Sequence, residues 1–379
     1  MKTDPKDFCQ VRFRPLAVVL GCLVFAAGCE RGTPLQFVPS TAASELDPPL
    51  QEAVRKELQA RCGTPAAPKL LGSDEKDAEH LRYGARVYEH NCAQCHGVSG
   101  DGNGPAAAYL APRPRDYRRG IFKFTSTPYG SKPRREDLLR TVTRGITGTS
   151  MPSFRRMPKR DLEAVVDYVL ALTHRGELEV LLADHAENEG ALDDESAAEL
   201  AEVVLKRWKL AAGEVVEPAT KMPPLSPESV AAGAAAFQKR ECFKCHGRDG
   251  RGGLAGGIEV GTDAWGHKAA AADLTSGMLR GGQKPLDVYR RIYAGINGTP
   301  MPTFKDVFAT EPDTIWQLTH YVLHLADERR RGIQFALGPV TPAPASEPLP
   351  AGESQAQPPS EPDGPASQAA PKSSSEEPQ

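Results

Sequence analysis

A short pattern of two cysteines and a histidine occurs twice in this chain and constrains its fold more than any other feature. The stretch HNCAQCHGVSG holds one copy at residues 90–100, and RECFKCHGRDG holds the other at residues 240–250. In both copies two residues separate the cysteines, and the histidine follows the second cysteine directly. The chain has 8 cysteines. The use of four of them in one repeated arrangement indicates a shared chemical role.

This pattern is the attachment signal of c-type haem. On one helical turn both thiols can reach the vinyl groups of a single porphyrin, while the imidazole of the next residue points at the iron. The sequence therefore predicts two covalently bound haem c groups. The attachment residues are Cys92 and Cys95 with His96 for the first haem, and Cys242 and Cys245 with His246 for the second.

Two other chemistries use cysteine pairs. Structural zinc takes four ligands, and neither copy has a second pair of cysteines or histidines at the spacing of a zinc finger. A thioredoxin-like redox pair needs a strand followed by a helix, a context that this sequence lacks, and it gives no reason for the histidine. Haem attachment is the favoured interpretation.

The repeated motifs belong to a longer internal duplication. RTVTRGITGTSMPSF at residues 140–154 aligns without a gap on RRIYAGINGTPMPTF at residues 290–304, an offset of 150 that also superposes the two cysteine motifs. A second pair of landmarks, RDY at 115–117 and ADL at 272–274, is offset by 157. Loop lengths therefore differ between the copies, although their ends agree.

Helical patterns open and close each copy. Apolar residues at helical spacing precede each cysteine pair and follow each Met-Pro pair, and no stretch shows sustained two-residue alternation. The sequence therefore predicts an all-α fold with long loops. The expected helices cover residues 81–90 and 160–174 in the first copy, and 230–240 and 312–327 in the second.

A sixth iron ligand is expected from methionine, because its soft thioether is a common partner of haem iron. Met151 and Met301 each lie 55 residues after the motif histidine, between a Gly-containing turn and a proline. Packing in the core is the other common role of methionine. Met157 and Met278 have no counterpart in the other copy and are alternative ligands, and His267 is a fallback for the second haem.

Each copy resembles a class I cytochrome c domain, and the resemblance covers about 200 of the 379 residues. In that family the first and last helices cross at a glycine and an aromatic residue. The resemblance thus implies that Gly84 and Tyr88 lie against the helix holding Tyr168, and that Gly233 and Phe237 lie against Trp316 and Tyr321. The second copy departs from the first by one extra residue between Phe237 and Cys242.

Composition divides the rest of the chain. Residues 176–226 contain twelve acidic and four basic residues, with acids leading and bases trailing in DDESAAELAEVVLKRWKLA, which favours a helical linker. The end of the chain is rich in Pro, Ser and Ala and has little to bury, which is typical of disorder. The predicted parts are a signal at 1–29, a tether with one short helix at 30–75, a first cytochrome c domain at 76–175, the linker at 176–226, a second cytochrome c domain at 227–332 and a disordered tail at 333–379.

The first residues predict export. Four basic residues precede an apolar run at residues 16–27, which is shorter than a comfortable membrane span and fits the core of a secretory signal. The following FAAGC is similar to a bacterial lipoprotein signal, which would make Cys29 the lipidated first residue; Ala26 stands where leucine is usual. Ordinary cleavage and retention as an anchor are the alternatives. The expected location is the periplasmic side of a membrane, with a lipid anchor.

Export also limits the cysteine chemistry. If Cys9 and Cys22 leave with the signal and Cys29 is acylated, Cys62 is left without a partner outside the two haem motifs. A disulfide framework is therefore not expected.

Charge gives a clue about partners. The net charge of −3 and the low aromatic content do not indicate nucleic acid. Residues 76–175, however, hold eighteen Lys and Arg against ten Asp and Glu, with basic clusters in the loops that flank Met151. The family places an exposed haem edge near these loops, so the cluster could guide docking on an acidic redox protein, or could simply be a solvated face. Arg115 and Tyr117 are candidates to bond haem propionates.

These features predict an exported dihaem cytochrome c that passes single electrons between a membrane-associated oxidoreductase and a terminal acceptor. It is expected to be an electron carrier and not an enzyme. Two alternatives stay open: a dihaem enzyme resembling bacterial cytochrome c peroxidase, in which one iron offers an open site, and a subunit fixed in a larger redox complex, docked through the linker helix.

Overall fold

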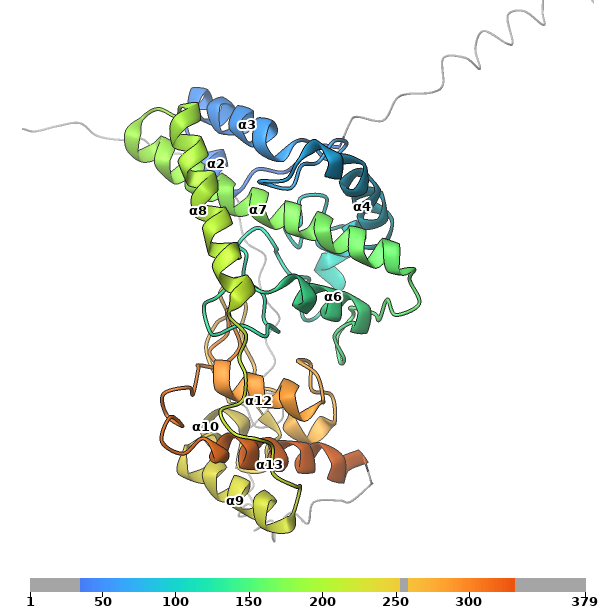
Figure 1. Cartoon of the computed structure of the whole chain (residues 1–379), viewed down its shortest axis with the longest axis vertical. Coiled ribbons are helices and arrows are strands. Elements are labelled where there is room, and N and C mark those ends of the chain that lie inside the picture. The colour runs from blue at the N-terminus through green and yellow to red at the C-terminus, as the bar shows by residue number, and fades with distance from the viewer. Residues whose placement is uncertain (1–34, 253–257, 331–379) are drawn as a thin grey trace, which may run out of the picture. The chain divides into compact units, whose positions relative to one another are not determined.

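Helices form the regular secondary structure of residues 35–252 and 258–330, the part of the chain that the computed structural model describes (Figure 1). Within these residues the only β pairing is two isolated bridges, so the prediction of an all-α fold is confirmed. The α-helices are α2 (Thr41–Glu45), α3 (Pro48–Cys62), α4 (Ala78–Asn91), α5 (Ala93–His96), α6 (Arg135–Arg144), α7 (Lys159–Glu189), α8 (Asp194–Gly213), α9 (Pro227–Lys239), α10 (Phe243–His246), α12 (Pro285–Ala294) and α13 (Asp313–Arg330). Three single 3₁₀ turns are Glu75–Asp77, Ala107–Tyr109 and Leu274–Ser276.

Two groups of predictions fall outside these residues: the signal with its lipidation site Cys29, and the tail from residue 333. Among the helices in the described part of the chain, none combines the length and the apolar character that crossing a membrane requires.

The first domain is organised by the crossing of α4 and α7. At the crossing point a Cβ on Gly84 would lie 2.2 Å from the carbonyl oxygen of Ala164, so the two backbones touch where only glycine fits. One turn further along α4, the rings of Tyr88 and Tyr168 pack with their centroids 5.2 Å apart. The crossing expected from the resemblance is confirmed for this domain.

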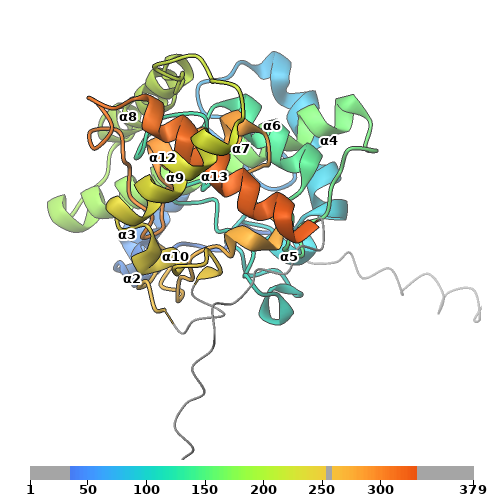
Figure 2. The same cartoon turned by 90° about the horizontal axis from the view of Figure 1, so that it is seen from below.

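The second domain repeats this crossing with α9 and α13, which lie side by side in Figure 1 and Figure 2. A Cβ on Gly233 would lie 2.1 Å from the carbonyl oxygen of Gln317, and the rings of Phe237 and Tyr321 are 5.4 Å apart. The expectation for Trp316 was wrong. Trp316 precedes Gln317 by one residue, so it lies about 100° around the helix, and its ring packs 4.5 Å from that of Tyr289 on α12.

Helix α7 is longer than the sequence predicts. Its 31 residues run without a break through positions 175 and 176, where the first domain was expected to give way to the linker, so the predicted boundary lies within a helix. Beyond that point α3 and α8 pack against α7 around Leu178 and Leu182, both with no exposed surface. The helix expected in the tether is α3, and the acidic stretch expected to be helical is α8, which Asp193 caps by accepting a hydrogen bond from the Ser196 N–H.

Cys62 belongs to the apolar cluster that α3, α7 and α8 form. It is the last residue of α3, its side chain is 3 % exposed, and it packs with Leu58 and Leu178. Burial raises the pKa of its thiol to about 12, so the thiol stays protonated and unreactive at neutral pH. The structure thus accounts for Cys62 as a small apolar core residue.

Candidate haem sites

Each cysteine motif forms one short helical turn. Cys92 precedes α5 and Cys242 precedes α10, and in each the histidine N–H donates to the carbonyl of the first cysteine, at 2.9 Å for His96 and 3.0 Å for His246. The next residue, Gly97 or Gly247, ends the turn at φ +75° or +74°, a conformation that favours glycine. Two thiols and an imidazole are therefore held on a single turn, as covalent haem attachment requires.

The motif histidines are oriented by backbone carbonyls. Nδ1 of His96 lies 3.1 Å from the carbonyl oxygen of Arg115, and Nδ1 of His246 lies 3.1 Å from that of Ala272. A carbonyl only accepts, so Nδ1 carries the proton and Nε2 keeps a lone pair for a metal. Burial lowers the pKa of His96 to about 4 and also lowers that of His246, which keeps both rings neutral. These donor atoms fit an iron porphyrin.

The two carbonyls also test the alignment of the copies. Arg115 follows His96 by 19 residues, whereas Ala272 follows His246 by 26. The backbone N–H two residues after each carbonyl donates to a glycine, Tyr117 to Gly100 and Leu274 to Gly250, both at 2.7 Å. The RDY and ADL landmarks are therefore equivalent, and the second domain has seven additional residues ahead of this point.

The extra residue before Cys242 is absorbed locally. Glu241 adopts a φ of +59°. Among the described residues it is the only non-glycine residue with a positive φ. This single left-handed residue lets the Cys242 N–H reach the carbonyl of Phe237 at 3.0 Å, just as the Cys92 N–H reaches that of Tyr88 at 2.8 Å. The cysteine therefore returns to the same register in both domains.

The methionine loops of the two domains have the same conformation. The Ile146 N–H donates to the carbonyl of Met151 at 3.2 Å, and the Ile296 N–H donates to that of Met301 at the same distance. In each loop a threonine hydroxyl accepts from the methionine N–H at 3.2 Å and donates to the isoleucine carbonyl at 2.8 Å; the residues are Thr149 and Thr299. Two partly buried thioethers are thus presented from one backbone geometry.

The alternative ligands have other surroundings. Met157 packs against the apolar core cluster of the first domain. Met278 is 51 % exposed. Its sulfur lies 3.5 Å from the position that a Cβ would take if Gly148, in the first methionine loop, had a side chain. His267 is exposed and lies in a loop where its N–H donates to Asp263. The shared loop conformation therefore favours Met151 and Met301 over these three.

Tyr117 and Arg115 lie beside the first motif. The Tyr117 ring stacks on the imidazole of His96 with centroids 4.7 Å apart. The Arg115 guanidinium carbon lies 3.5 Å from the ring centroid of Trp265 in the second domain, and burial lowers the pKa of Arg115 to about 10. Tyr117 therefore positions His96, whereas Arg115 joins the two domains.

Trp265 is a residue that the sequence reasoning missed. A Cβ on Gly298 in the Met301 loop would lie 2.6 Å from its ring, while Arg115 and Lys123 of the first domain face the same ring. Its indole N–H is buried and has no partner in the described residues. The signal that could have found it is the change of offset from 150 to 157, because Trp265 lies within the longer segment of the second domain.

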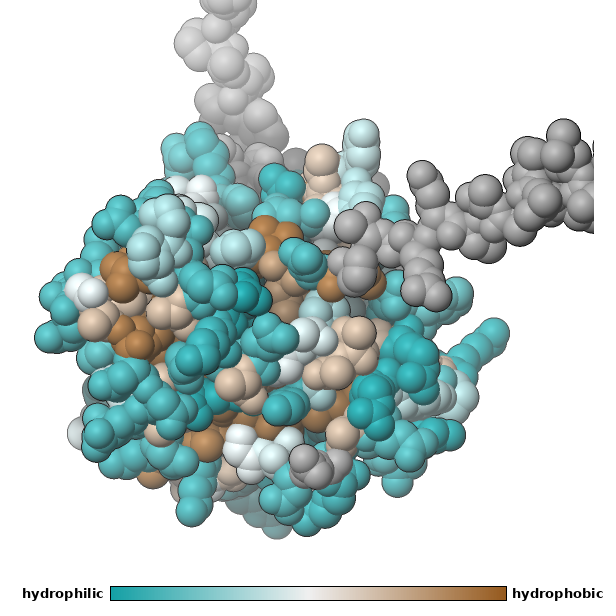
Figure 3. Space-filling view, turned by 90° about the horizontal axis from the view of Figure 1, so that it is seen from above, coloured by the Kyte–Doolittle hydropathy of each residue, from teal (hydrophilic) through white to brown (hydrophobic). Residues whose placement is uncertain are grey.

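Some of the basic residues of the first domain pair with the second domain. Arg144 lies 3.3 Å from Asp287, and Lys123 lies 3.2 Å from Asp263. These cations are neutralised within the chain, so fewer remain for an acidic partner than the sequence count suggests. On the face shown in Figure 3 hydrophilic residues predominate and apolar residues form small groups between them.

Comparisons with known proteins agree with this geometry. Residues 79–169 match the family model described as cytochrome c oxidase, cbb3-type, subunit III, and residues 230–326 match the model described as cytochrome c. A chain of the solved Kuenenia stuttgartiensis reducing HAO-like protein complex Kustc0457/Kustc0458 is similar, with 29% identity and a TM-score of 0.50 over 64% of this chain and 95% of that chain. Comparison with curated proteins gave no match.

The fold and the matched models define a protein with two cytochrome c domains in tandem, as the sequence predicts. The first domain matches the cbb3-type model and the second matches the general cytochrome c model. Two such domains imply two covalently bound haem c groups, and electron transfer as the class of function.

Proposed function

We propose that this protein is a dihaem electron carrier that exchanges single electrons with redox proteins outside the cytoplasmic membrane. The observation that carries the proposal is the matching hydrogen-bond pattern of the two methionine loops, because it gives each domain the same candidate axial ligand, which suits a carrier, whereas a peroxidase-like enzyme needs one open site. Residues 1–29 and Cys29 support export and a lipid anchor.

The proposed ligands follow from the site geometry. Cys92 with Cys95, and Cys242 with Cys245, would form the thioether links; His96 with Met151, and His246 with Met301, would be the axial ligands. When bound, haem c supplies one-electron Fe(III)/Fe(II) chemistry. The Nδ1–H bonds to backbone carbonyls fix each imidazole and raise its basicity, and the threonine bonds fix each methionine backbone.

A spectroscopic redox titration of the matured full chain tests this proposal. We expect both haems to titrate at positive potentials, because thioether ligation raises the potential relative to bis-histidine ligation. Met151→His and Met301→His should each lower the reduction potential of one haem by a few tenths of a volt, within the range of about 0.8 V that axial ligands span. A wild-type haem at a strongly negative potential would contradict the carrier proposal and call for a test of peroxide turnover.

A second candidate is a subunit held permanently in a redox complex. It is favoured by the similarity to a chain of a complex that contains a HAO-like protein, since 95% of that chain is covered. Helix α8 offers a docking surface, because Val203 and Leu210 are exposed and lie seven residues, or about two turns, apart on one face.

Isolation of the native protein at physiological ionic strength distinguishes the two candidates. For a fixed subunit we expect stoichiometric co-purification with a second haem protein, and loss of that partner in the Val203→Ser/Leu210→Ser variant with haem content unchanged. Elution of the native protein as a single chain would leave the carrier as the only supported function.

A further inference from the structure

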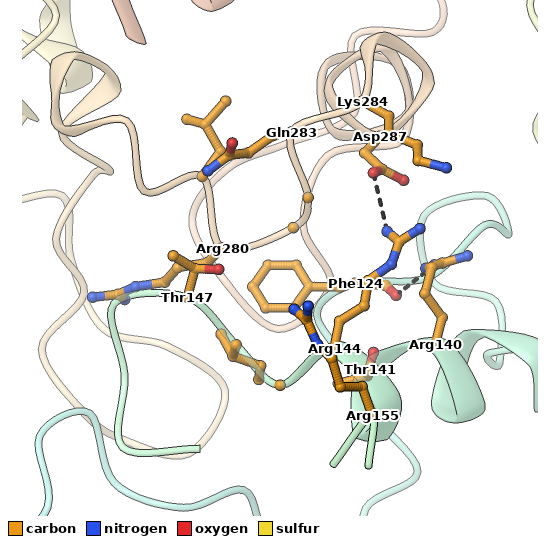
Figure 4. A pocket seen from close by; sticks show the side chains of 15 residues that line it. Phe124, Arg140, Thr141, Arg144, Thr147, Arg155, Arg280, Gln283, Lys284 and Asp287 are labelled. Atoms are coloured by element: carbon orange, nitrogen blue, oxygen red, sulfur yellow. Dashed lines mark hydrogen bonds and ion pairs between the residues drawn. The ribbon is translucent and has the colours of Figure 1, made fainter. Parts of the chain in front are cut away.

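A cavity of about 410 Å³ is lined by residues of both cytochrome c domains, and neither haem motif contributes to its lining (Figure 4). One side is formed by the end of α6 and the start of the Met151 loop, including Gly145 and Thr147. The other side is formed by the segment that leads into α12, including Gly281 and Gln283. None of the proposed thioether or axial ligands lines it.

Cationic side chains dominate the lining. The lining has five cationic side chains and one carboxylate, Asp287. The cations are Arg140, Arg144 and Arg155 from the first domain and Arg280 and Lys284 from the second. Figure 4 shows the three arginines of the first domain gathered around Phe124. Positive charge from both domains therefore converges on one volume.

Only part of this charge is neutralised. Arg144 pairs with Asp287 at 3.3 Å, and Arg140 pairs at 2.8 Å with Asp137, which lies outside the lining. In the described residues Arg155 donates only to Ser153, and Arg280 and Lys284 form no ion pair. The cavity thus keeps an excess of three positive charges beyond these two pairs.

Arg155, Arg280 and Lys284 are exposed to solvent, so anions from solution can reach this excess of positive charge. A cleft lined by one sign of charge concentrates counter-ions. The guanidinium fork also matches the paired oxygens of carboxylates and phosphates, so arginine is the side chain expected where such groups bind.

We propose that this cavity binds a small anion that carries two or more negative charges on oxygen, and that the bound anion joins the two domains. At about 410 Å³ the cavity has room for a phosphate-like or polycarboxylate ion together with water. The site also adjoins the proposed axial methionine of the first domain, because the Ile146 N–H, on the cavity wall, donates to the Met151 carbonyl. The binding site itself does not depend on that ligation.

Calorimetric titration of the matured full chain at constant ionic strength tests the proposal, with inorganic phosphate, citrate and chloride as probes. We expect saturable one-to-one binding of phosphate or citrate and none of chloride. The Arg155→Gln/Arg280→Gln variant removes one unpaired cation from each domain and should weaken binding at least tenfold. Preference between phosphate and citrate identifies the oxyanion class.

A matched pair of exposed arginines provides the control. Arg82→Gln/Arg207→Gln removes the same charge at two residues that do not line the cavity and should leave the affinity unchanged. Haem content and thermal unfolding of each variant establish that it is folded. Absence of saturable binding in the wild type, or equal weakening in the control variant, would overturn the proposal whether or not both haems have methionine ligands.

Discussion

Replacing Cys92 and Cys95 together by serine is expected to reduce the haem content from two per chain to one. Serine hydroxyls form no thioether bonds, so the first domain loses covalent attachment while the second domain keeps it. The mirror variant, Cys242→Ser/Cys245→Ser, should give the same count with the other haem retained. Haem per chain is measured by pyridine haemochrome absorbance, and covalent attachment by the intact mass.

Cys62→Ala is the control for cysteine loss. Cys62 is buried in the cluster between α3 and α7, apart from both motifs, so its replacement should leave two haems per chain. In the two double variants, the redox titration should show a single haem, so the spectra and potentials of the two haems can be assigned separately. Retention of two covalent haems in either double variant would refute the proposed attachment sites.

Gly84→Ala and Gly233→Ala are each expected to destabilise the chain by about 3 kcal/mol. The added methyl group would lie 2.2 Å from the Ala164 carbonyl oxygen in the first case and 2.1 Å from that of Gln317 in the second. Both neighbours are backbone atoms of the crossing helix, so the helices themselves must separate. Chemical unfolding followed by circular dichroism measures the loss.

Gly213→Ala makes the same chemical change where there is room for it. Gly213 ends α8, and a Cβ there meets no atom within 4 Å. Alanine should therefore be neutral or stabilising by about 0.5 kcal/mol, since it restricts the unfolded chain. Similar effects of all three substitutions would show that the helix crossings do not determine stability.

The sequence was most informative where the chemistry is local. Cys92, Cys95 and His96 lie on a single turn, so their spacing alone predicts a haem, and the matched family models bear out the two-domain prediction. The resemblance to class I cytochrome c domains located the helix crossings at Gly84 and Gly233, and the structure shows that the close backbone approach there leaves room only for glycine.

Prediction was less successful where one helix continues through a change of composition. The sequence becomes acidic after residue 175, yet α7 continues to Glu189, because Leu178 and Leu182 are covered by α3 and α8. The prediction also placed Trp316 on the face of α13 that meets α9. A shift of one residue along a helix turns the side chain toward another neighbour, and Trp316 packs against Tyr289 on α12.

The sequence by itself determined the two cytochrome c domains, their haem chemistry and their helical class, because these follow from residues a few positions apart. Tertiary structure alone decided how Trp265 meets Arg115, how Asp287 pairs with Arg144, and that cations from both domains surround one cavity. The two residue pairs are 150 and 143 positions apart in the chain. Spacing carries no information about such pairs, because their geometry depends on how whole helices and loops pack.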